Sequence, residues 1–149
     1  MEQRFVAMQE IKDRFYEKKN DLGLLYLKDT PSGEIDPDQT PAILLTSGTD
    51  SIGKYSNRSD HGYPAQRILE VSIEAIINSR DIDVVDFFKN VRKTAFIGRG
   101  TNPEIVDIQV ADGVFIRENR SEGPFGYGLP NMIGMRLVLD LLYTDNGII

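Results

Sequence analysis

The chain contains no cysteine and only one histidine among its 149 residues. Without cysteine it can form no disulfide framework, no thiolate zinc site and no cysteine nucleophile. No apolar run approaches the roughly 20 residues that a membrane span requires, so we expect no membrane segment. The residues Met1 to Phe5 also lack the charged-then-apolar layout of a signal peptide. We therefore expect a cytosolic product, or one that is assembled in a cytosol.

The charge balance is acidic, with a formal net charge of −6. This argues against non-specific binding to duplex DNA, which depends on clustered Lys and Arg that release phosphate counterions. The length fits one domain over residues 1–149, and a chain of this size buries roughly 68–70% of its unfolded surface. The domain therefore needs no disulfide or metal ion in order to fold.

Two segments have the apolar spacing of amphipathic helices. Near the N-terminus, Phe5, Met8, Ile11 and Phe15 recur at helical intervals, and residues 20–23 carry stop signals. A second helix is predicted after Ser79 or Asp81, either of which can cap it. The apolar stripe of this second helix consists of Ile82, Val85, Phe88, Val91 and Ala95.

The remaining apolar segments predict strands. The clearest is 67–77, where apolar and polar residues alternate as in a half-buried strand. Asp112-Gly113 is a strong turn signal between two short strands. The order α-β-β-β-α-β-β-β predicts an α+β fold with a mainly antiparallel sheet and both helices on one face. The predicted strands are 24–27, 42–46, 67–77, 106–110, 114–116 and 132–143.

Two segments rich in turn-forming residues, 47–66 and 119–131, are predicted to be long loops. Loops of such length are usually functional in compact domains. An eleven-residue strand at 67–77 would span about 36 Å. A globule of this chain length has a radius of gyration of only about 15 Å. We therefore expect the strand to leave the body and to carry the 47–66 loop as a projecting hairpin arm.

The segment 48–54, Gly-Thr-Asp-Ser-Ile-Gly-Lys, resembles the start of a phosphate-binding P-loop. Such a loop requires Ser or Thr after the lysine to hold Mg²⁺, and then a helix N-terminus. Here Tyr55 follows Lys54, and the residues after it are turn formers. We expect no nucleotide site, although a small nucleotide-binding domain or enzyme that uses 48–54 stays open as the alternative from another class.

The remaining chemical signals are weak. The glycine-rich segment 123–128 contains Pro124, which spoils the turn of a nucleotide-binding loop, and it does not lie between a strand and a helix. His61 is the only histidine, and neither a catalytic triad nor a set of metal ligands forms around it in the sequence. We therefore predict no catalytic residue, no cofactor and no metal site, and no enzymatic activity.

Aromatic and arginine side chains concentrate in the two predicted loops. These residue types are enriched at the cores of protein interfaces, and long strands present edges that pair with neighbouring chains. Both features favour self-assembly over catalysis. The candidate interface residues are Tyr55, Arg58, His61, Tyr63, Phe125 and Tyr127.

The layout of roughly residues 5–143 resembles the tail terminator (tail completion) proteins of tailed bacteriophages. The resemblance rests on the order of the elements and on the pattern of apolar and polar residues within them. It includes the N-terminal amphipathic helix and the long polar loop that follows the second strand. Four segments carry it further: Thr40-Pro-Ala-Ile-Leu-Leu45, Arg67-Ile-Leu-Glu-Val-Ser-Ile-Glu74, Asp83-Val-Val-Asp-Phe-Phe88 and Met135-Arg-Leu-Val-Leu-Asp-Leu141.

This resemblance implies a virion structural protein, assembled in the host cytoplasm and located in the tail or neck. It implies a ring, commonly hexameric, that caps the tail tube and joins the tail to the head–tail connector protein. The implied partners are further copies of this chain, the tail tube protein and the connector, while DNA passes through the lumen without specific binding. Another head–tail connector or neck subunit remains open as a neighbouring alternative.

Overall fold

The computed structural model describes residues 3–29, 35–55, 65–96, 108–111 and 114–145. Apart from one 3-10 helix, its elements follow the predicted order α-β-β-β-α-β-β-β, which confirms the α+β class. The elements are α1 (Gln3–Glu17), β1 (Tyr26–Lys28), the 3-10 helix η1 (Pro37–Gln39), β2 (Ala42–Tyr55), β3 (Ala65–Asn78), α2 (Val84–Ala95), β4 (Ile108–Ala111), β5 (Val114–Gly126) and β6 (Met132–Asp145).

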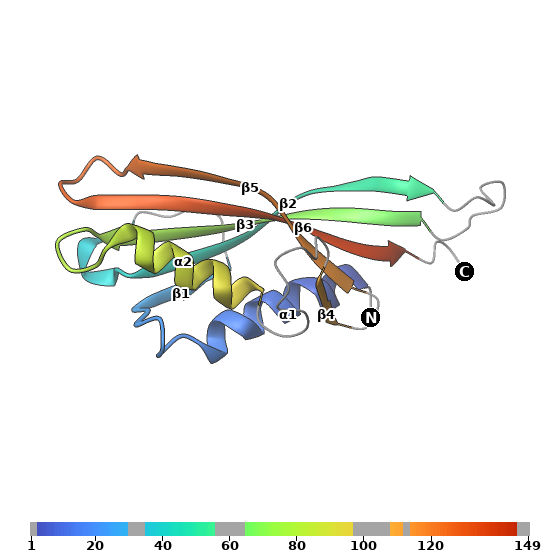
Figure 1. The fold of residues 1–149 in the computed structure, drawn as a ribbon, viewed down its shortest axis with the longest axis horizontal. Coiled ribbons are helices and arrows are strands. Elements are labelled where there is room, and N and C mark those ends of the chain that lie inside the picture. Colours follow the sequence, from blue (N-terminus) through green and yellow to red (C-terminus); the bar gives the residue numbers. More distant parts are fainter. Residues whose placement is uncertain (1–2, 30–34, 56–64, 97–107, 112–113, 146–149) are drawn as a thin grey trace.

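The strands form one six-stranded sheet in the order β1-β2-β3-β6-β5-β4. Only β1 and β2 run parallel, and every other neighbouring pair is antiparallel. The central strands β3 and β6 pair without interruption along their whole length, from Ala65 opposite Asp145 to Asn78 opposite Met132. Figure 1 shows α1 and α2 lying along the same face of this sheet, as predicted. We call the opposite face, which carries neither α1 nor α2, the outer face.

The main core lies between the helices and the sheet. Ile11 and Phe15 of α1 and Val91 of α2 are fully buried there. Alternate residues of β3 and β6 face these helices, so the predicted alternation of 67–77 is confirmed. Because burial of apolar surface stabilises by about 25 cal/mol per Å², this layer holds the helices on the sheet. The buried residues that β3 and β6 contribute to this core are Leu69, Val71, Ile73, Ala75, Ile77, Leu137, Leu139, Leu141 and Tyr143.

Two predicted loops are largely strand, which corrects the sequence interpretation. Residues 47–55 belong to β2, and residues 119–126 belong to β5. Their Ser, Gly, Asp and Pro content is typical of loops, but backbone pairing to β3 and β6 holds both segments extended. Each paired segment carries two register irregularities, where single extra residues relieve the conflict between these residue types and a regular ladder. The first predicted strand also begins later, at Tyr26 rather than Leu24.

The predicted arm is present and is built from three strands. The last pair between β5 and β6 joins Phe115 to Leu142, whereas β3 and β6 stay paired as far as Ala65 and Asp145. At this end β2 continues alongside β3 to Tyr55. Figure 1 shows β2, β3 and β6 extending together beyond the helices. Residues 56–64 lie outside the part of the chain that the structure describes.

Asp83, rather than Ser79 or Asp81, caps α2. Its carboxylate accepts hydrogen bonds from the amides of Val85 at 2.8 Å and Asp86 at 3.4 Å. We expect Asp83→Ala to lower the free energy of unfolding by about 1 kcal/mol, because two amides of the first turn lose their acceptor. Urea denaturation measures this loss. Asp81→Ala is the matched control, since Asp81 lies two residues away with no part in the cap, and an equal loss in both variants would contradict the assignment.

Candidate assembly surface

The outer face of the sheet carries a connected set of charged side chains on three of its six strands, β3, β6 and β5. They face outward because they alternate along each strand with the residues of the main core. Four are acidic and three are basic, so the cluster is close to neutral with one acid in excess. We call it the outer-face network; its members are Glu70, Glu74, Arg117, Arg120, Glu122, Arg136 and Asp140.

Arg136 of β6 lies at the centre of one half of this network. The register places it directly opposite Glu74 of β3 and Glu122 of β5. Its guanidinium nitrogens lie 3.1 Å from Glu122 and 3.8 Å from Glu74, and the group sits 5.6 Å from the centre of the Phe125 ring. Cross-strand pairs of opposite charge contribute roughly 0.2–1 kcal/mol each. Arg136 therefore holds three strands in one register from the outer side.

The other half of the network surrounds Asp140 of β6. Its side chain is buried, and it accepts hydrogen bonds from Arg117 at 3.2 Å and Asn119 at 3.0 Å. The register sets Asp140 opposite Glu70, which is a repulsive arrangement. Arg120 lies 3.5 Å from Glu70 and offsets this repulsion. The two arginines of β5 thus keep two neighbouring carboxylates together.

Arg120 also forms the shortest contact of the network with Glu122, at 2.6 Å. This hydrogen bond, rather than the more distant charges, is the main reason why the pKa of Glu122 lies below its usual value. The pKa of the Arg120 guanidinium is raised by the same hydrogen bond. Both side chains are still reached by solvent, so the pair orders the surface and adds little stability.

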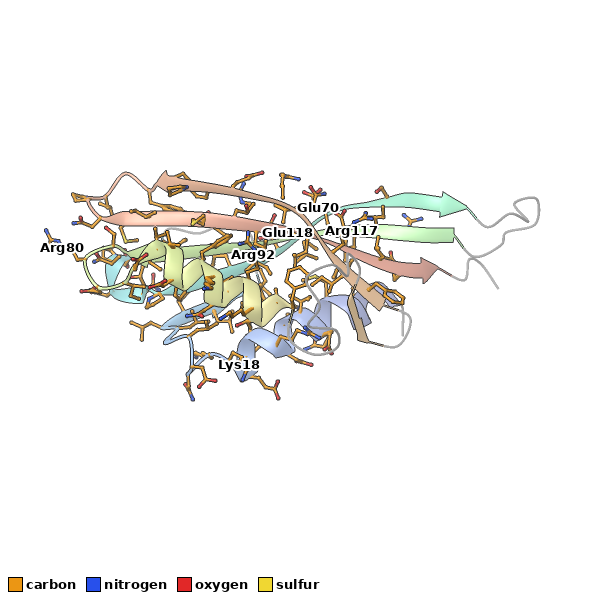
Figure 2. The ribbon with its side chains drawn as sticks, in the orientation of Figure 1. Lys18, Glu70, Arg80, Arg92, Arg117 and Glu118 are labelled. Carbon is orange, nitrogen blue, oxygen red and sulfur yellow. The ribbon has the colours of Figure 1, made fainter. Side chains whose placement is uncertain are left out.

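The helix-bearing face is tied to β5 by a separate ion pair. Arg92 of α2 lies 2.9 Å from Glu118, and its guanidinium stacks 5.1 Å from the Phe88 ring. Figure 2 shows Arg92 and Glu118 together over α2, with Arg117 beside them on β5. Because neighbouring residues of a strand point to opposite faces, Arg117 joins the outer-face network while Glu118 faces the helix.

Phe125 and Tyr127, two of the six predicted interface residues, lie together on the outer face. Their ring centres are 5.6 Å apart, and the Tyr127 hydroxyl donates a hydrogen bond to Glu74. Burial, followed by this hydrogen bond, raises the pKa of Tyr127 well above its usual value. Both side chains are half-buried rather than fully exposed at a loop tip, which corrects the sequence interpretation.

Gly134 of β6 provides the space for these two rings. A Cβ atom at this position would lie 2.9 Å from the Phe125 ring and would overlap the Tyr127 ring. The glycine is buried although it occupies the outer face. Tyr127 also packs against a small apolar cluster on this face, formed by Ile35, Ala42, Leu44, Ile76 and Met132. The end of the sheet near the β5–β6 turn is thus apolar, whereas the middle is charged.

Of the other four predicted interface residues, only Tyr55 belongs to the described part of the chain. Tyr55 ends β2 on the projecting arm, and Arg58, His61 and Tyr63 lie outside the described residues. The P-loop-like segment 48–54 is part of β2, with Ser51 opposite Ile68 and Lys54 opposite Gln66. An extended strand does not curl its amides around a phosphate as a P-loop does. The alternative of a nucleotide site in a loop at 48–54 therefore loses its structural basis.

Within the part of the chain that the structure describes, no group of three or more His, Asp or Glu residues is placed to hold a metal ion. No helix among these residues is long and apolar enough to cross a membrane.

The outer-face network could not be predicted from the sequence, because its ion pairs depend on which residues of neighbouring strands lie opposite one another. Glu70, Glu74, Arg136 and Asp140 could be assigned to outward positions from alternation alone. The sequence signal that was available is the opposite sign of these outward charges on successive long strands. Arg120 gave no such signal because residues 119–131 were predicted to be a loop, and Arg117 lay just beyond the predicted strand 114–116.

No family model and no curated protein sequence matches this chain. The fold, however, is shared with a chain in a solved structure of the virion of a native gene transfer agent particle. The two chains superpose with a TM-score of 0.51 at 13% sequence identity, over 91% of this chain and 95% of the other. At this identity the likeness concerns the fold, and it extends over nearly the whole length of both chains.

Proposed function

We propose that this protein is a virion structural protein of a phage-like particle that works as a tail terminator. Copies of the chain form a ring, hexameric by the family resemblance, that caps the tail tube and meets the head–tail connector. The observation that carries the proposal is the fold shared, over nearly the whole length of both chains, with a component of a gene transfer agent virion.

The surface described above supports an assembly role. The sheet continues as a three-stranded arm beyond the helices, and an extension of this kind provides area for contact with a neighbouring subunit. Backbone pairing and the ion pairs of the outer-face network hold β3, β6 and β5 in one arrangement before any association. Rigid sheets lose little conformational entropy on association, and this favours binding between preformed surfaces.

The charge of the outer face suits a surface past which DNA moves. The three arginines of the outer-face network each lie 2.6–3.8 Å from carboxylates, which leaves no free basic cluster in this network to hold phosphate groups. The whole chain is acidic as well. A ring that presents this face to its lumen would let DNA pass without retaining it.

Electron microscopy of negatively stained samples tests this role. The purified chain is imaged alone and after mixing with tail tubes assembled without a terminator. We expect rings, or caps on tube ends, and a narrower distribution of tube lengths, because a capped end adds no further tube subunits. Free chains that never dock on tubes, together with unchanged tube growth, would contradict the proposal.

A further inference from the structure

Both sides of the sheet have a long unpaired edge. On one side β1 pairs only with Ala42–Leu44, and on the other side β4 pairs only with residues 114–116 of β5. Within the described residues, no other strand pairs with the outer edge of β2 or of β5. Residues 45–55 and 117–126 therefore present rows of backbone N–H and C=O groups to a partner strand.

These two open edges match in length and direction. The edge of β2 has eleven residues and that of β5 has ten, and the strands are antiparallel within the sheet. When two copies meet head to tail, β2 of one therefore lies antiparallel to β5 of the next. The short strands limit where a second copy can pair. β1 already occupies the edge of β2 up to Leu44, and β4 occupies the edge of β5 up to Ile116. If the two free edges pair along their whole length, Leu45 lies opposite Gly126.

The irregularities of the two edges point to the same register. Those of β2 lie between Ser47 and Asp50 and between Ile52 and Lys54. Those of β5 lie between Glu122 and Phe125 and between Glu118 and Arg120, in reverse order along the chain. With Leu45 opposite Gly126, each irregularity of β2 faces one of β5 that also contains a single extra residue. Bulges in an edge strand usually discourage pairing with another strand. Here each irregularity of β2 would lie opposite an irregularity of β5, so the two edges still fit each other.

The side-chain faces agree with this register as well. Leu45 and Gly126 pair with helix-facing residues of β3 and β6, so both belong to the helix-bearing side. Thr46 and Phe125 both belong to the outer side. The same holds for Ser51 and Arg120, which face each other in this register. A shift of one residue would bring opposite faces together, because side chains alternate with a period of two.

We propose that the edge of β2 (residues 45–55) pairs with the edge of β5 (residues 117–126) of a second copy of this chain, with Leu45 opposite Gly126. This inference names the contact by which the ring of the proposed function is built, and it rests on that function. The contact joins two different surfaces of the chain. Repeating it from copy to copy therefore gives a closed ring when the successive rotations add up to one full turn.

The register also sets how the strands incline in a ring. Within one chain Leu45 is level with Ser121, through Ile73 and Leu137, so the intermolecular pairing is displaced by five residues along the strands. This is about 17 Å, against a width of about 19 Å for the four strands β2, β3, β6 and β5. The ratio corresponds to a tilt of about 40°, within the range of about 35–45° found in closed barrels.

Site-specific photo-crosslinking tests the contact. The photoreactive amino acid p-benzoylphenylalanine replaces the exposed Ser51 in the full chain, which is then assembled on tail tubes and irradiated. On a denaturing gel, we expect the protein band to shift from the mass of one chain to that of two. Mass spectrometry of the cross-linked peptides should map the cross-links to residues 117–126, centred on Arg120. Within one chain β3 and β6 separate β2 from β5 by about 14 Å, so these cross-links join two copies. The matched control places the probe at the exposed Glu17, the last residue of α1, which should give no cross-link to 117–126.

Two different failures can be told apart. Rings that form normally but cross-link Ser51 elsewhere, or not at all, would overturn the paired edges and leave the terminator role standing. If the chain forms neither rings nor cross-links, both the contact and the proposed function are wrong.

Discussion

Replacing Phe15 with alanine is expected to lower the free energy of unfolding by about 3–5 kcal/mol. The ring is fully buried and belongs to the cluster that joins α1 to the sheet. Arg14, the residue before Phe15 in α1, donates a hydrogen bond of 2.9 Å to the carbonyl of Ala95 at the end of α2. Because both helices meet here, a cavity at Phe15 loosens the whole helical layer. Domains are commonly stable by only about 5–15 kcal/mol, so the loss is a large share of the total.

Chemical denaturation of the free chain measures the effect. Tyr16→Ala is the control, because Tyr16 is the next residue of the same helix and its side chain is 55% exposed. We expect a change of about 0.5 kcal/mol or less for this variant. A similar small loss for Phe15→Ala would show that α1 contributes little to the core and would contradict the packing described above.

The second large effect is expected at Gly134. An added methyl group would overlap the rings of Phe125 and Tyr127, so Gly134→Ala should lower the free energy of unfolding by about 1–3 kcal/mol. The displaced tyrosine would also lose its hydrogen bond to Glu74. Gly126→Ala is the control on the neighbouring strand, since a Cβ atom there meets nothing within 4 Å.

A double-mutant cycle identifies the cause. Removing the ring with Tyr127→Ala should relieve much of the penalty of Gly134→Ala, so that the two changes are strongly non-additive. Tyr127→Phe keeps the ring and should leave the penalty in place. Additive losses in the first pair would mean that the glycine is needed for another reason than the space it leaves for the aromatic rings.

The centre of the sheet could be predicted from the sequence because the alternation of apolar and polar residues within each single strand indicates it. Residues 67–77 and 132–143 alternate between apolar and polar side chains, and the main core uses this alternation directly. The order of the elements, the placement of both helices on one face and the projecting arm followed from the same patterns. The N-cap of α2 was misplaced by a few residues, since three acids and a serine compete for that position within 79–86.

The flanking strands could not be predicted because long-range pairing overrides their composition. Residues 47–55 contain Ser, Gly, Thr and Asp, yet β3 lies beside them and supplies their hydrogen bonds. Residues 119–126 include Gly123, whose φ of +109° suits a bulge, and they stay in the sheet through pairing with β6. The same limit hid the outer-face network, since its ion pairs depend on a register that no single strand encodes.

The most direct test of the proposed assembly role is cryo-electron microscopy of the particle that we propose to contain this chain. The proposed function predicts a ring of identical copies at the head-proximal end of the tail. The proposed edge contact places β2 of each copy beside β5 of the next. A density map that places the chain as an isolated monomer, or outside the tail and neck, would contradict it.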